Sequence, residues 1–61
     1  MPAYEFCYLT LDGKLDFKFL AQCTSEQHAK ILAHAMKSPQ HRKVEVWQDR
    51  DLIYTRPAAP N

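Results

Sequence analysis

The fold is decided by the stretch YEFCYLTLDGKLDFKFLA, residues 4–21. Aromatic, β-branched and apolar residues dominate both of its ends, and such residues favour the pleated, half-buried surface of a strand. Between the two ends lies Asp12-Gly13, a dipeptide that tolerates the positive φ angles of a two-residue hairpin turn. The stretch therefore predicts a β-hairpin, with strands over residues 3–11 and 14–22.

A two-residue turn also fixes which side chains share a face of this hairpin. One face holds the cross-strand pairs Thr10–Leu15, Tyr8–Phe17, Phe6–Phe19 and Tyr4–Ala21. The other face holds Leu11–Lys14, Leu9–Asp16, Cys7–Lys18 and Glu5–Leu20, a mixture of charged and apolar side chains. Because the first face is almost entirely aromatic and apolar, we expect it to face the core.

A single amphipathic helix is predicted after the hairpin. Thr24 and Gln27 have the spacing of a capping box, in which each side chain bonds the backbone of the other residue. Apolar residues then recur at helical spacing, namely Ala29, Leu32, Ala33 and Met36. The Ser38-Pro39 step disfavours helical geometry at Ser38 and ends the helix there.

A second hairpin is predicted from Val44–Trp47 and Leu52–Thr55, on either side of the charged turn at residues 48–51. Pairing Val46 with Ile53 and Trp47 with Leu52 turns Val44, Val46 and Ile53 toward the helix. The same register leaves Glu45, Trp47, Leu52 and Tyr54 on the outer face.

These elements predict an α+β fold of the ββαββ type, with one helix on one face of a four-stranded antiparallel sheet. A short connection through the helix favours the strand order 2-1-3-4. Residues 1–56 are expected to form a single domain and residues 57–61 a flexible C-terminal tail.

The composition narrows the classes of function. The chain has 61 residues, 46% of them hydrophobic, and a formal net charge of +1, which gives no global field that would attract nucleic acid or a membrane. No apolar run is long enough for a transmembrane span or a secretory signal, so we expect a cytoplasmic protein without a membrane partner. Cys7 and Cys23 lack CxxC spacing, which favours free, buried thiols.

No residue pattern indicates catalysis, a cofactor or a metal. Cys23 precedes the helix, where a thiolate would be stabilised, but no histidine has local spacing to it. His28 and His34 are six residues apart and point away from each other on a helix, and His41 adds no usual zinc spacing. A thin two-layer domain also has little room for a pocket of ~300 Å³ or more. We therefore expect a protein that is not an enzyme, with no catalytic, cofactor or metal residues.

The outer sheet face is the most informative surface. Four residues of it, Leu9, Trp47, Leu52 and Tyr54, are predicted to form an apolar patch of the kind found in interface cores. Such a patch, together with free edge strands, favours self-association, with a homodimer expected first and another protein as partner second.

An alternative function rests on basic residues that follow the helix. Lys37, Arg42 and Lys43, together with His41, could contact phosphates as a small nucleic-acid-binding site. Cations near a helix C-terminus are also simply stabilising, and the aromatic residues that might stack on bases are expected in the core. This alternative therefore ranks below self-association.

Two short segments also carry a resemblance. The opening Met1-Pro2-Ala3-Tyr4-Glu5-Phe6 and the later Val44-Glu45-Val46-Trp47, followed by Leu52-Ile53, resemble those of short bacterial proteins of unknown function. The resemblance brings no catalytic residue with it.

Overall fold

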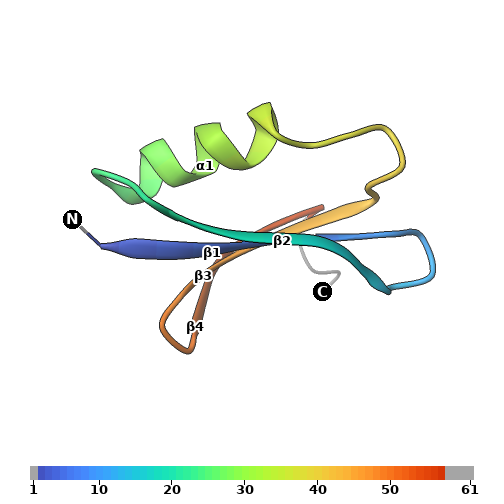
Figure 1. Cartoon of the computed structure of the whole chain (residues 1–61), viewed down its shortest axis with the longest axis horizontal. Coiled ribbons are helices and arrows are strands. Elements are labelled where there is room, and N and C mark those ends of the chain that lie inside the picture. Colours follow the sequence, from blue (N-terminus) through green and yellow to red (C-terminus); the bar gives the residue numbers. More distant parts are fainter. Residues whose placement is uncertain (1, 58–61) are drawn as a thin grey trace.

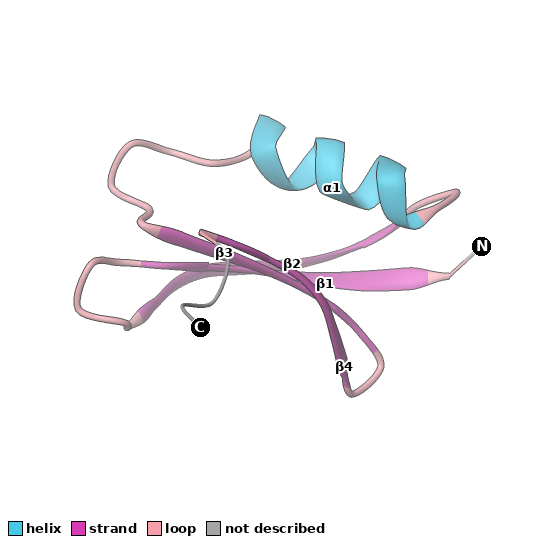
Figure 2. Ribbon diagram, turned by 180° about the vertical axis from the view of Figure 1, so that it is seen from behind, coloured by secondary structure: helices cyan, strands magenta, loops and turns pink. Residues whose placement is uncertain are grey.

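The computed structural model describes residues 2–57, and within them it confirms the predicted ββαββ arrangement. The elements are β1 (Ala3–Leu9), β2 (Leu15–Gln22), α1 (Glu26–Ala35), β3 (Lys43–Gln48) and β4 (Asp51–Arg56). All neighbouring strands are antiparallel, and their order in the sheet is β2-β1-β3-β4. Helix α1 lies across one face of this sheet (Figure 1 and Figure 2). Most of the predicted C-terminal tail, residues 58–61, lies outside the described residues.

The first hairpin has the predicted pairing in the core, but its turn is longer than predicted and a bulge compensates for the extra residue. Tyr4, Phe6 and Tyr8 of β1 pair with Ala21, Phe19 and Phe17 of β2, as expected. Nearer the turn, however, Leu9 pairs with Leu15 rather than with Asp16. Asp16 is therefore an extra residue in β2, a β-bulge, and the predicted pairs Leu9–Asp16, Thr10–Leu15 and Leu11–Lys14 are wrong.

The turn itself explains the bulge. The Gly13 amide donates to the Thr10 carbonyl (2.9 Å) and the Thr10 amide donates to the Lys14 carbonyl (2.9 Å), which encloses a three-residue loop at residues 11–13. Gly13 has φ +83° with open space where a Cβ would lie, so the backbone angle alone requires glycine there. The longer loop shifts the register by one residue, and the bulge at Asp16 shifts it back.

A second bulge corrects the prediction for the other hairpin. Trp47 pairs with Leu52 as predicted, but Val46 pairs with Tyr54, which leaves Ile53 as the extra residue in β4. Both Ile53 and Tyr54 pack against the buried core, so Tyr54 lies on the helix side and not on the outer face. The loop between β3 and β4 has two residues, and Asp49 takes a left-handed conformation there, with φ 56°.

Helix α1 begins one residue later than predicted. Ser25 is the N-cap, because its hydroxyl accepts a hydrogen bond from the His28 amide (3.1 Å). The His28 side chain reaches back, where its Nδ1 accepts from the Thr24 amide (3.2 Å). The predicted capping box of Thr24 and Gln27 is therefore wrong: Ser25 caps the helix, and the His28 side chain bonds the amide of the residue before the cap.

The core lies between β1, β3 and the helix. Its buried members are Tyr4, Phe6, Tyr8, Cys23, Ala29, Ala33, Val44 and Val46. The helix contributes two alanines, whose small side chains let it approach the sheet closely, and it packs mainly on β3. Met36 and Phe17, both expected in the core, remain 46% and 41% exposed, and the helix packs on β3 more than on β2.

Candidate functional site

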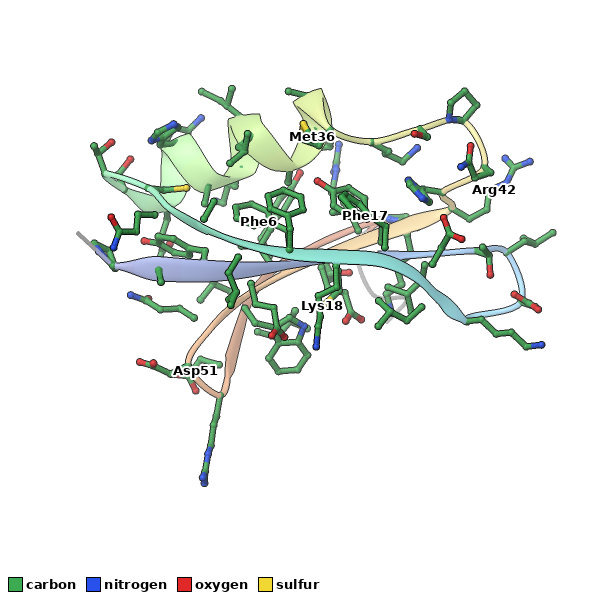
Figure 3. All side chains as sticks on the ribbon, viewed as in Figure 1. Phe6, Phe17, Lys18, Met36, Arg42 and Asp51 are labelled. Atoms are coloured by element: carbon green, nitrogen blue, oxygen red, sulfur yellow. The ribbon has the colours of Figure 1, made fainter. Side chains whose placement is uncertain are left out.

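Strand β2 is the most exposed apolar element among the described residues. It is an edge strand, and its side chains Leu15 (54% exposed), Phe17 (41%) and Leu20 (71%) remain largely in contact with solvent. Only Phe19 and Ala21 of this strand pack against the core. Figure 3 shows Phe6 and Phe17 on the side of the sheet that faces α1, and Lys18 on the opposite side. The free edge of β2 thus carries apolar groups on both faces.

The outer sheet face is more charged at its centre than the sequence suggested. Glu5 lies between Leu20 and Trp47 across the strands, and Cys7 lies between Lys18 and Glu45. Two ion pairs lie on this face: Lys18–Glu5 (3.8 Å) joins β2 to β1, and Lys43–Glu45 (3.3 Å) lies along β3. Covering this centre with another chain would remove charged groups from water, which costs free energy unless new partners are supplied.

The four predicted interface residues do not form one patch. Leu9 lies on the outer face beside Lys43, and Trp47 and Leu52 form a pair on the same face farther along the sheet. The Trp47 indole donates to the Glu45 carboxylate (3.1 Å). Tyr54 is turned to the other side, where its hydroxyl and the His34 Nε2 are 2.5 Å apart. The Lys30 ammonium also lies 5.4 Å from the centre of the Tyr54 ring.

Both cysteines are free thiols and both are buried, as predicted. Burial raises the pKa of the Cys7 thiol, and the neighbouring carboxylates of Glu5 and Glu45 raise this pKa further. Burial also raises the pKa of the Cys23 thiol, which lies in the core. Neither thiol is therefore activated as a nucleophile, since the thiolate is the reactive form.

The predicted basic cluster is divided by the structure. Lys43 pairs with Glu45, and His41 is buried with only 3% of its surface exposed. Lys37 and Arg42 remain exposed on the segment between α1 and β3. Within residues 2–57, no three histidine, cysteine or acidic side chains lie close enough to hold a metal ion.

Buried His41 forms an unexpected polar site with Asp16. Its Nδ1 accepts a hydrogen bond from the Ser38 amide (3.1 Å), so the ring proton is on Nε2, which donates to the Asp16 carboxylate (2.8 Å). The ring also packs on Tyr8, with centroids 5.2 Å apart. The imidazole thereby lies between the Ser38 amide and the carboxylate and orients the carboxylate.

An open depression lies beside this pair. It has a volume of about 380 Å³ and is lined by Asp16, Phe17, Met36, Ser38, Gln40 and His41. The sequence predicted little room for such a space. Phe17 lies near the start of β2 and Met36 at the end of α1. Both side chains stay partly exposed and leave the space beside the segment that follows the helix open.

The Asp16–His41 pair could not be identified from sequence spacing. The two residues are 25 positions apart, and the alternation of strand residues places Asp16 on the outer face. The bulge turns Asp16 toward the helix side instead, which is a recognised effect of bulges on nearby side chains. One available signal was a histidine in a polar connection next to the strand that begins at Lys43.

Comparison of the chain with models of known protein families, with curated proteins and with solved structures finds no match. Within residues 2–57, helix α1 is neither long enough nor apolar enough to cross a membrane.

Proposed function

We propose that this protein is a non-enzymatic interaction module that forms a homodimer through the free edge of β2. The observation that carries the proposal is the exposure of Leu20 and Phe17 on an edge strand. Unpaired backbone groups along a strand edge are a template for another strand. Exposed apolar side chains on both faces of that edge supply the surface that pairing would bury.

A twofold axis at Leu20 gives the best match between two β2 strands. In antiparallel pairing, directly opposed side chains lie on the same face. An axis at Leu20 sets this residue against its own copy, Phe19 against Ala21, and Lys18 against Gln22. An axis at Lys18 would instead oppose two ammonium groups, which is unfavourable. The Leu20 register buries the most exposed apolar side chain of the strand and opposes no like charges.

The geometry of the outer face favours the edge over stacking of two sheets. The ion-paired Glu5 and Glu45 lie at the centre of that face, so stacking would desolvate them. Edge pairing leaves both carboxylates at the surface. It also leaves both helices on one side of a continuous sheet.

Light scattering on two matched variants tests this interface. Leu20→Lys and Leu52→Lys place the same charge in the same cross-strand row, at opposite edges of the sheet. We expect the wild-type chain to have about twice the mass of the 7.1-kDa monomer, Leu20→Lys to be monomeric, and Leu52→Lys to remain dimeric. A monomeric wild type at all concentrations would refute dimerisation. Dissociation by Leu52→Lys and Trp47→Ala, with Leu20→Lys unaffected, would place the interface on the outer face.

A crosslinking experiment tests the register. Leu20→Cys is expected to form an intermolecular disulfide under mild oxidation, whereas Lys18→Cys, which faces Gln22 of the other copy, is not. The native thiols of Cys7 and Cys23 are buried and give little background. Equal crosslinking of both variants would contradict an axis at Leu20.

A further inference from the structure

We propose that the depression beside Asp16 binds a small organic cation, whose ammonium group pairs with the Asp16 carboxylate and whose apolar body packs on Phe17 and Met36. This site shares Phe17 with the proposed dimer interface, but the inference does not depend on dimerisation. It rests on the position, charge and surroundings of Asp16.

Asp16 is held in place from two directions. The bulge in β2 turns it toward the helix side, and the Nε2–H of His41 donates to its Oδ2 (2.8 Å). His41 is fixed in turn by the Ser38 amide at Nδ1 and by its packing on Tyr8. A carboxylate on an exposed strand edge would ordinarily sample several rotamers, whereas this one is pre-oriented by a buried donor.

The ion-pair partners of this carboxylate differ from those of Glu5 and Glu45. Across residues 2–57, no lysine or arginine nitrogen lies within 4.0 Å of Asp16, while Glu5 and Glu45 each have a lysine partner at such a distance. The Ser38 amide is directed at Nδ1 of His41, and the contact of His41 with Asp16 is a hydrogen bond through Nε2. The side chain of Asp16 is 42% exposed, so a cation can reach the carboxylate from solvent.

The remaining walls select a partly apolar ligand. Phe17 and Met36 present an aromatic ring and a thioether to the depression, both about half exposed. An ammonium ion near an aromatic ring gains cation–π attraction, and a methionine side chain adapts to ligands of varied shape. Gln40 and Ser38 add polar residues to the lining. An arylalkylamine therefore fits the site better than a carbohydrate or an anion.

Two sources could supply this chemistry, namely a free amine and a lysine side chain of a polypeptide. Benzylamine represents the first source and N-acetyl-lysine methylamide the second. The proposal requires at least one of them to bind more tightly than benzyl alcohol, which has the same aromatic body without the charge. The tighter binder of the two amines identifies the source.

Amide chemical shifts in a titration followed by ¹H–¹⁵N spectra test the site. Benzylamine is expected to shift the amides of Phe17, Ser38 and His41, with saturation, and benzyl alcohol is expected to do so much more weakly. Asp16→Asn should weaken benzylamine binding about tenfold or more, because it removes the charge but keeps the oxygen that accepts from His41. Asp12→Asn, which removes an exposed carboxylate from the same hairpin, should bind as the wild type does.

The proposal is overturned if benzyl alcohol and the two amines bind equally, or if Asp16→Asn and Asp12→Asn behave alike. The same titration on Leu20→Lys separates the two proposals, since that variant removes the dimer interface and leaves the depression intact. Saturable binding by Leu20→Lys supports the cation site whatever the oligomeric state of the wild type.

Discussion

Tyr8 shows how much a single side chain contributes at the centre of this thin core. It is fully buried, its hydroxyl donates to the Ala33 carbonyl (2.7 Å), and its ring lies against Phe17, Phe19 and His41. Tyr8 thus links the helix, the first hairpin and the segment before β3. Burial raises the pKa of its phenol to about 12, because the phenolate would lose its hydration inside the core.

This shift predicts a loss of stability at alkaline pH. The unfolded phenol ionises near pH 10, while the folded one keeps its proton to about pH 12, so the stabilisation is complete below about pH 10 and is lost as the pH rises to about 12. The expected loss is about 2–3 kcal/mol in the free energy of unfolding. Urea unfolding at several alkaline pH values measures it. Tyr8→Phe should show a shallower decline over the same range, and equal slopes for the two proteins would contradict the assignment.

On the helix side of the two central strands, β1 and β3, residue burial was predictable from strand alternation. Phe6, Tyr8, Val44 and Val46 are all fully buried, as the pattern required. His41 was not predictable, because its burial depends on a partner 25 residues away and on the Ser38 amide. A polar residue in a connecting segment is ordinarily exposed, and only the tertiary contact reverses this.

At the scale of the elements, the helix start offers a direct comparison between two neighbouring residues. Ser25→Ala removes the hydroxyl that accepts from the His28 amide and is expected to cost about 1 kcal/mol of stability. Thr24→Ala should cost clearly less, because the Thr24 hydroxyl bonds a side chain and not a helix amide. Thermal unfolding followed by circular dichroism measures both. A larger loss of stability for Thr24→Ala than for Ser25→Ala would contradict Ser25 as the N-cap and favour Thr24, as the sequence spacing predicted.

The limits of the strand predictions lie in the bulges. In the first hairpin, the additional loop residue and the bulge at Asp16 cancel, so the core pairs could be predicted although the turn could not. In the second hairpin nothing compensates for the bulge at Ile53, and Tyr54 therefore moves to the other face. Residue alternation contains no signal for an unpaired residue within a strand.

At the scale of the whole molecule, the order of the strands predicts where hydrogen exchange is slow. β1 and β3 are central and paired on both sides, so their amides should exchange most slowly. β2 and β4 are both edges and should exchange faster in a monomer. The proposed dimer adds protection only at β2, and this protection should increase with protein concentration. Exchange measured at a low and a high concentration tests this, and an equal gain at β4 would contradict edge pairing through β2.

The overall topology was predictable because short connections leave few alternatives for a ββαββ chain. The position of the helix over the sheet was not. Periodicity indicated a face containing Ala29, Leu32, Ala33 and Met36. Ala29 and Ala33 are buried and Leu32 packs against the core, whereas Met36 at the end of the helix stays 46% exposed. The helix packs mainly on β3 and leaves apolar side chains of β2 exposed, and the β2 edge is the surface on which the proposed dimer depends.

The bulge at Ile53 limits how many copies of the chain an assembly could join edge to edge. A strand with an irregular hydrogen-bonding edge is a poor seed for the next strand, and β4 is also short and begins with the charged residue Asp51. Two copies joined at β2 would present only β4 at their outer margins. Such a dimer would not add further copies at its outer edges. Pairing at β2 would thereby protect this chain, whose β2 edge is exposed and apolar, from polymerising into fibrils.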